Sequence, residues 1–94
     1  MKGYVVGEIE ISDAGAYEIY RSRVEATIRD HGGQYLVRGG NAEALEGSAP
    51  KRIVVLEFPS PTAAKTWYHS SAYQEIIDLR LAAAKGRLML VEGI

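Results

Sequence analysis

Glu57 is the residue of this chain whose position points most directly to chemistry. It follows the apolar run of residues 53–56 and shares one side of an extended segment with Ile53 and Val55, because successive side chains of a strand alternate between its two faces. We expect this side to face away from the helices. A carboxylate there could act as a general base or orient a substrate, with a pKa tuned by burial. The alternative is a structural ion pair of Glu57 with Arg38 or Arg52 that sets the geometry of the sheet or of a dimer.

Arg38 is followed by two glycines, Gly39 and Gly40. Exposed backbone N–H groups beside a guanidinium group can bind an anion. Two glycines after a strand also simply make a turn. The spacing is that of neither a phosphate-binding P-loop nor a dinucleotide fingerprint. Arg38 is therefore a candidate ligand-binding residue that could stabilise an anion or an enolate.

Aromatic side chains gather on two helical segments and could line a pocket. Tyr17 and Tyr20 recur on the first segment, and Trp67 and Tyr73 lie on a later one. Aromatic rings at helical spacing are typical of a hydrophobic core, but buried tyrosine hydroxyls also need hydrogen-bond partners. We expect these four residues either to fill the core or to form the wall of a ligand pocket.

Histidine and arginine provide two further candidates. His69 could act as an auxiliary acid, since imidazole titrates near neutrality, or it could be an exposed residue at a helix end. Arg80 lies between Leu79 and Leu81, which are expected to face inward. It could pair with Glu75, Asp78 or the acidic strand ends, and a structural salt bridge is favoured over substrate binding. There is no Ser-His-Asp order, metal-ligand spacing or phosphate loop, so the sequence predicts no metal and no cofactor.

The elements that must position these residues follow a β-α-β-β-α-β order. Apolar alternation predicts strands, and apolar residues three and four apart predict helices. The expected strands are residues 4–11, 34–38, 51–58 and 87–91, and the expected helical segments are residues 13–31, 62–69 and 72–84. N-caps are expected from the pair Ser12-Asp13, from Ser60 and from the pair Ser70-Ser71. Glycines at 32, 33 and 86 are expected to end the helices. Residues 39–50 are expected to form a loop anchored by Leu45.

This order predicts an α+β, ferredoxin-like fold in a single domain of residues 1–94, with a four-stranded antiparallel sheet and both helical units on one face. The first and third strands should lie in the middle. Every strand has apolar residues on both faces, although an antiparallel sheet covered on one side should be polar on the other. We therefore predict a homodimer that packs sheet against sheet.

Composition excludes several classes of protein. The chain has 94 residues, a formal net charge of −1 and no cysteine, so disulfides and thiolate chemistry are excluded. No basic run suggests nucleic acid, and no apolar run approaches the roughly 20 residues that span a bilayer. The chain enters a strand within its first few residues, which leaves no room for a signal peptide. We expect a cytoplasmic protein with no nucleic-acid or membrane partner.

Several blocks of sequence resemble the bacterial family catalogued as domain of unknown function 1330. They occur in order along nearly the whole chain: YVVGEIEI, DHGGQYLVRGG, LEG, RIVVLEFPS, WYHSSAYQ, LRLAAA and VEG. The resemblance implies the dimeric α/β-barrel superfamily, in which two ferredoxin-like units pack their sheets into a shared barrel. Related families include cofactor-free monooxygenases, lactone isomerases and haem-degrading enzymes. The chain departs from the family where Asn commonly follows the Trp-Tyr pair, since His69 takes that position and Ser71 replaces a common proline.

Two hypotheses follow for function. The first is a homodimeric barrel that binds a small organic acid or aromatic compound and acts as a cofactor-independent enzyme by proton transfer or oxygenation. It requires a cavity of roughly 300 Å³ or more that converges on Glu57. The second is a non-catalytic interaction or stress-associated dimer, with a structural Glu57–Arg ion pair and a filled space between the sheets.

Overall fold

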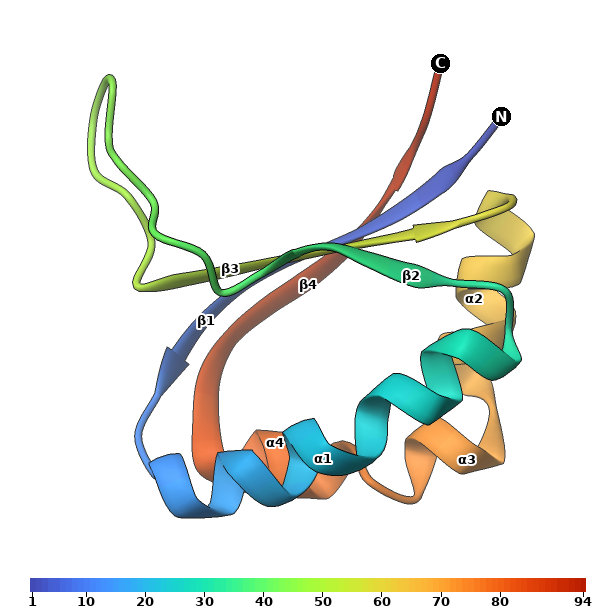
Figure 1. Cartoon of the computed structure of the whole chain (residues 1–94), viewed down its shortest axis with the longest axis horizontal. Coiled ribbons are helices and arrows are strands. Elements are labelled where there is room, and N and C mark those ends of the chain that lie inside the picture. Colours follow the sequence, from blue (N-terminus) through green and yellow to red (C-terminus); the bar gives the residue numbers. More distant parts are fainter.

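Alternating apolar side chains form a four-stranded antiparallel sheet at the centre of the chain. The computed structural model describes residues 1–94 and has the order β1 (Gly3–Ile11), α1 (Ala14–Asp30), β2 (Gln34–Arg38), β3 (Arg52–Phe58), α2 (Pro61–His69), α3 (Ser71–Gln74), α4 (Ile77–Ala83) and β4 (Ala84–Glu92). The sheet order is β2-β3-β1-β4. The helices lie on one side of the sheet (Figure 1). The predicted ferredoxin-like α+β fold, with β1 and β3 in the middle, is confirmed.

The helix starts follow from local side-chain chemistry. The carboxylate of Asp13 accepts a hydrogen bond from the N–H of Ala16 at 3.0 Å. Ser60 and Ser70 accept from N–H groups three residues ahead at 3.1 and 3.2 Å. These side chains satisfy backbone donors that have no partner within the helix. All three predicted N-caps are confirmed.

The prediction of one continuous helix over residues 72–84 is wrong. The chain forms two short helices, α3 and α4, and turns at Ile76, whose side chain is buried. The last strand begins at Ala84, three residues earlier than predicted. Gly86 pairs with Ile9 inside this strand instead of ending a helix. Ala83 fixes the corner, since its carbonyl oxygen accepts hydrogen bonds from the backbone and hydroxyl of Ser12.

The core lies between the helices and the sheet. The largest fully buried side chains include Trp67, Tyr73 and Phe58. The ring centroids of Trp67 and Tyr73 are 4.3 Å apart, and those of Trp67 and Phe58 are 5.5 Å apart. One predicted core position is wrong: Leu81 is 58% exposed, and the neighbouring Arg80 faces inward with only 8% exposed.

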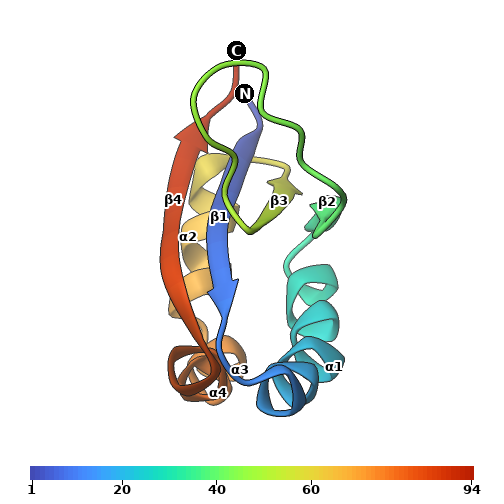
Figure 2. The ribbon, with the colours of Figure 1, turned by 90° about the vertical axis from the view of Figure 1, so that its left-hand side faces the viewer.

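The other face of the sheet has no helix over it. Figure 2 shows the four strands side by side, with the two chain ends close together. Val37 and Val91 on this open face are 38% and 44% exposed. Residues 39–51 rise on the same side, away from the helices (Figure 1). The prediction that Leu45 anchors this loop is wrong, since Leu45 is 90% exposed. None of the helices is both long enough and apolar enough to cross a bilayer.

Candidate anion-binding site

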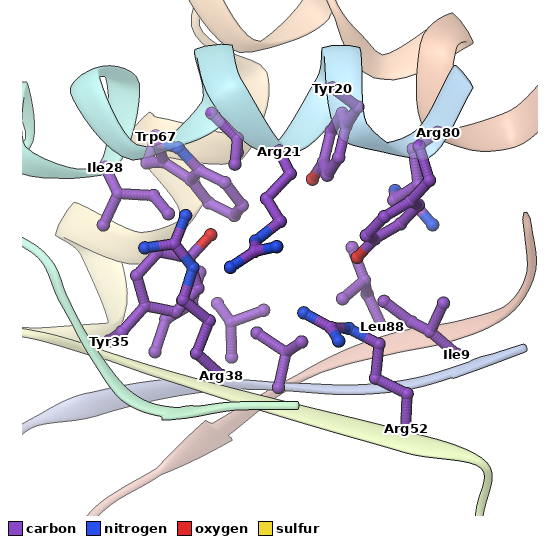
Figure 3. A pocket seen from close by; sticks show the side chains of 15 residues that line it. Ile9, Tyr20, Arg21, Ile28, Tyr35, Arg38, Arg52, Trp67, Arg80 and Leu88 are labelled. Atoms are coloured by element: carbon purple, nitrogen blue, oxygen red, sulfur yellow. The ribbon is translucent and has the colours of Figure 1, made fainter. Parts of the chain in front are cut away.

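Four arginines converge on a cavity between α1 and the sheet. They come from four different elements, α1, β2, β3 and α4, and are Arg21, Arg38, Arg52 and Arg80. Figure 3 shows Arg21 reaching from α1 toward the sheet, while Arg38 and Arg52 rise from the strands below. A cavity lined by four positively charged side chains is unusual in a hydrophobic core, where arginine is rarely buried.

Strand register explains why two of these arginines point inward. Arg38 pairs with Val54 across β2 and β3, and Arg52 pairs with Ile9 across β3 and β1. Residues opposite each other in a sheet share a face, and Val54 and Ile9 both line the cavity. A β-bulge in β2 between Tyr35 and Val37 shifts the register just before Arg38.

The arginines have few partners of opposite charge. Arg21 lies 3.3 Å from Glu18 at the exposed surface, and Arg38 lies 3.5 Å from Glu25. Arg52 and Arg80 form no ion pair with a carboxylate. The Nε atoms of Arg38 and Arg52 are buried and have no hydrogen-bond partner. Buried polar groups normally have partners, so these atoms mark unused donor capacity beside the cavity.

Two of the guanidinium groups rest on aromatic rings. Arg38 lies 4.5 Å from the ring centroid of Tyr35, and Arg52 lies 5.5 Å from that of Tyr17. Such contacts stabilise a cation without using its N–H donors for a carboxylate. The pKa of Tyr35 is raised, mainly by burial. Both rings therefore hold their arginines in place and leave N–H groups free for a ligand.

A hydrogen-bonded chain of three side chains lies at the Arg80 end of the cavity. The Nε of Arg80 donates to the hydroxyl of Tyr73 at 3.3 Å, and this hydroxyl lies 3.0 Å from that of Tyr20. Burial, followed by the proximity of Tyr73, raises the pKa of Tyr20 far above its usual range. Burial by itself would lower the pKa of Arg80, but Tyr73 and Tyr20 more than offset this effect and its pKa is raised. Tyr20 is therefore neutral and Arg80 is charged.

The rest of the lining is mostly apolar. The indole N–H of Trp67 donates to the hydroxyl of Thr27 at 3.0 Å, so it faces away from any ligand. With the arginine side chains in these positions the void is about 30 Å³, enough for one or two water molecules. A larger ligand would need to displace Arg21, which is 46% exposed and held only by the exposed Glu18. The apolar lining comprises mainly Val5, Ile9, Val24, Ile28, Val54, Leu56 and Leu88.

The structure brings most of the predicted ligand-binding residues together. Tyr17, Tyr20, Arg38 and Trp67 line the cavity, and Tyr73 lies behind Tyr20 through their shared hydrogen bond. The four aromatic residues also belong to the hydrophobic core. The same side chains thus contribute to the core and lie in or beside the cavity.

Glu57 lies on the opposite, open face of the sheet. Its carboxylate is 3.6 Å from the ammonium group of Lys2 and accepts a hydrogen bond from Gln34 at 3.2 Å. The predicted Glu57–Arg ion pair is wrong, because Arg38 and Arg52 point to the helix side. Glu57 lines none of the pockets of the chain. The cavity expected to converge on Glu57 would lie between the sheets of two copies and stays a prediction.

His69 is exposed at the end of α2, with its ring centroid 5.2 Å from that of Tyr68. It lines a separate groove between α2 and β4, beside Lys65 and Met89. The structure therefore does not bring His69 to the arginine cavity.

Sequence reasoning missed Arg21 and Arg80 as cavity residues and considered Arg52 only as a partner for Glu57. The predicted salt bridge of Arg80 with Glu75 or Asp78 is wrong, since its partner is a tyrosine hydroxyl. The sequence did contain a signal for Arg52. It lies two residues before Val54, and residues two apart in a strand point to the same face. No such signal marks Arg80. Its side chain points inward because the helix is broken between α3 and α4, and this break is not apparent from the sequence.

The donor set of the cavity fits an anion. Guanidinium groups and a neutral tyrosine hydroxyl donate hydrogen bonds and attract negative charge. No histidine, aspartate or glutamate lines the cavity, and no group of three such side chains anywhere in the chain is arranged to hold a metal ion.

The strand order and the single helical layer define a ferredoxin-like α+β protein. The chain belongs to the family described as "Domain of unknown function (DUF1330)", which matches residues 2–94. No curated protein matches the chain.

Solved structures share this fold at low sequence identity. A protein of unknown function from Rhodopseudomonas palustris, RPA0582, has a TM-score of 0.81 and 19% identity, with 99% of this chain and 82% of that one covered. A dimeric ferredoxin-like protein of unknown function from Jannaschia sp. CCS1 has a TM-score of 0.65 and 14% identity, with 100% and 99% covered. SnoaB, a cofactor-independent oxygenase from Streptomyces nogalater, has a TM-score of 0.65 and 11% identity, with 99% and 93% covered.

Proposed function

We propose that this protein binds a small aromatic or enolic organic acid, as its anion, in the cavity between α1 and the sheet. The observation that carries the proposal is the convergence of four guanidinium groups on a cavity with no carboxylate in its lining. The ligand would be held by the N–H donors of Arg38 and Arg52 that have no partner. Its apolar part would contact the aliphatic and aromatic walls.

Electrostatics supports an anionic ligand. Several positive charges around one poorly hydrated cavity repel one another, and taking a charge out of water is costly without a counterion. Arg80 is 8% exposed and has only a tyrosine oxygen as partner. A bound anion would relieve this repulsion and accept the free hydrogen bonds, so it should stabilise the folded chain.

The same features favour chemistry on the ligand anion itself. The cavity offers positive charge and hydrogen-bond donors, which stabilise an enolate or phenolate, but its lining has no carboxylate or imidazole to act as a base. Such anions are the forms of carbon acids that exchange protons and react with molecular oxygen. The description of SnoaB as a cofactor-independent oxygenase supports an enzyme of this kind on the same fold. Glu57 and His69 lie outside the cavity, and we assign them no role in it.

The proposal includes a homodimer. The open face of the sheet carries apolar side chains, including the exposed Val37 and Val91, and exposed apolar surface of this kind usually marks an interface. The Jannaschia protein with this fold is described as dimeric. The open face lies on the other side of the sheet from the cavity, so a second copy there would leave α1 and Arg21 free for ligand entry.

Calorimetric titration with benzoate tests the binding proposal. Arg52→Met should weaken benzoate binding at least tenfold, because a hydrogen bond to a charged group is worth about 1.5–3 kcal/mol. Arg23→Met is the matched control, since Arg23 is exposed on α1 and lines no pocket. It should bind benzoate within about twofold of the wild type. Benzylamine, a cation of similar shape, should not bind.

Two outcomes would reject the proposed function. One is the absence of a heat signal and of a thermal shift with benzoate, acetate and pyruvate at millimolar concentration. The other is an equal loss of binding in Arg52→Met and Arg23→Met, which would show only a general effect of net charge.

A further inference from the structure

The hydrogen bonds that link Arg80, Tyr73 and Tyr20 run in one direction, from donor to acceptor. A guanidinium N–H can only donate, so Arg80 donates to the oxygen of Tyr73 at 3.3 Å. The hydroxyls of Tyr73 and Tyr20 are 3.0 Å apart, and either one could donate to the other. The direction of this second hydrogen bond decides which hydroxyl has a proton left for another partner.

Burial settles that direction. If Tyr20 donated to Tyr73, the proton of Tyr73 would have no acceptor in the structure, although Tyr73 is completely buried. A buried donor without a partner costs about 1–3 kcal/mol. If Tyr73 donates to Tyr20, the proton left over belongs to Tyr20, which lines the cavity. The favoured order is therefore Arg80 to Tyr73 to Tyr20, with the last O–H free to donate into the cavity.

Two effects favour Tyr20 as a hydrogen-bond donor. Burial raises its pKa far above the usual value, so the hydroxyl keeps its proton. The positive charge of Arg80 polarises the chain from behind, and hydrogen bonds in series strengthen one another. A neutral donor backed by a buried cation is suited to an oxygen that carries negative charge.

A second polar region lies at a different end of the cavity. The buried Nε atom of Arg38 has no partner there. Figure 3 places Arg38 beside Trp67 and Ile28 on one side, and Tyr20 with Arg80 on the other. The walls between them are aliphatic and aromatic. A ligand that satisfies both ends needs two oxygen groups separated by a flat apolar part.

The geometry points to a ligand with both a carboxylate and a phenolic or enolic hydroxyl. The carboxylate binds Arg38 and is attracted by the charge of Arg52, and the second oxygen, when deprotonated, accepts the hydrogen bond from Tyr20. This inference rests on the proposed anion binding and extends it to the ligand class. By stabilising the anion, Tyr20 would lower the pKa of the bound hydroxyl and so favour the reactive form of the ligand.

Two probes that differ by one hydroxyl test the inference. 4-Hydroxy-3-nitrobenzoate has a carboxylate and a phenol whose anion absorbs visible light, and 3-nitrobenzoate lacks the phenol. The wild type should bind the hydroxylated probe about tenfold more tightly, the effect of one hydrogen bond to a charged group. Titration of the absorbance should show a pKa of the bound phenol about one unit below that of the free probe.

Tyr20→Phe should remove the preference for the hydroxylated probe and return the phenol pKa to its free value, with binding of 3-nitrobenzoate changed less than twofold. Tyr4→Phe is the matched control, because Tyr4 lies on the open face of the sheet opposite Glu57 and lines no pocket. It should keep the preference. The comparison of the two probes on the wild type stands even if Tyr20→Phe fails to fold.

The outcomes separate this inference from the proposed function. If the wild type binds 3-nitrobenzoate, with Arg52→Met weaker, but shows no preference for the hydroxyl and no shift of its pKa, the inference is overturned and anion binding stands. If neither probe binds, the inference falls together with the proposed function.

Discussion

At the scale of residues, Arg52 shows how the cavity acquires an unpaired charge. Arg52 lies on the same side of β3 as the inward-facing Val54 and Leu56, so its guanidinium group lies under α1. The ring of Tyr17 supports it on one side, and the backbone of Gly39 lies against it on another. None of these neighbours accepts a hydrogen bond from its Nε. The surroundings therefore fix the position of the charge without neutralising it.

Gly39→Ala should disturb both the fold and the cavity. Gly39 has a φ of 71°, a left-handed conformation that costs other residues free energy, and a Cβ there would collide with the guanidinium group of Arg52. We expect a loss of about 1–3 kcal/mol in the free energy of unfolding, measured by urea denaturation. Benzoate affinity should fall as well, because Arg52 has to move.

Gly40→Ala is the control for this prediction. Gly40 is exposed and has open space around its Cα, so alanine there should change stability by less than about 0.5 kcal/mol. Equal stability of the Gly39 and Gly40 variants would show that the contact with Arg52 does not restrict the backbone.

Some site residues could be predicted from sequence and others could not. Tyr20 and Arg38 were within reach, because helical spacing and strand ends mark them. The partner of Glu57 was not, because Arg38 follows a β-bulge that turns it to the helix side. Arg80 was also beyond reach, since its neighbours Leu79 and Leu81 suggested an apolar inward face, while the observed helix buries Arg80 and exposes Leu81.

At the scale of elements, α1 and α2 are joined through one buried hydrogen bond. The hydroxyl of Thr27 donates to the carbonyl oxygen of Val24 at 2.6 Å and accepts from the indole N–H of Trp67 at 3.0 Å. The Trp67 ring lines the cavity under α1. The hydroxyl of Thr27 therefore helps to set the position of α1 over the sheet.

Thr27→Val should test this link without changing the volume of the side chain. The indole N–H would lose its acceptor in a buried site, which costs about 1–3 kcal/mol of unfolding free energy. Thr27→Ser keeps the hydroxyl and should lose less. Because Trp67 is the single tryptophan of the chain, its fluorescence can follow unfolding in both variants. A serine variant no more stable than the valine variant would argue against the hydrogen bond.

Most elements were predictable because their signals are local. Strand alternation, helical spacing and the three N-caps gave the order and nearly all the boundaries. The break at Ile76 depends on tertiary contacts instead. Its side chain is buried in the core while its backbone leaves the regular helix. Residues 72–84 have a helical apolar pattern throughout, so the sequence alone favours one continuous helix there.

At the scale of the whole molecule, the two faces of the sheet differ in composition. The helix side holds the arginine cavity, whereas the open side combines apolar residues with Glu57 and its partners Lys2 and Gln34. The loop of residues 39–51, which contains the exposed Leu45, projects on the open side (Figure 1). The loop begins directly after Arg38 and ends directly before Arg52. A partner bound to the loop would therefore also restrain Arg38 and Arg52, the residues proposed to bind the ligand.

The proposed homodimer predicts a solution mass of twice the chain mass of 10.3 kDa, measurable by light scattering at micromolar concentration. Val55→Glu should convert the protein to a monomer, because Val55 lies on the open face of the central strand β3 and a carboxylate there would be buried without a partner. Leu81→Glu is the matched control, since Leu81 is 58% exposed on α4 in the helical layer. It should remain dimeric. A wild-type mass of one chain, or equal dissociation in both variants, would exclude the open face as the interface.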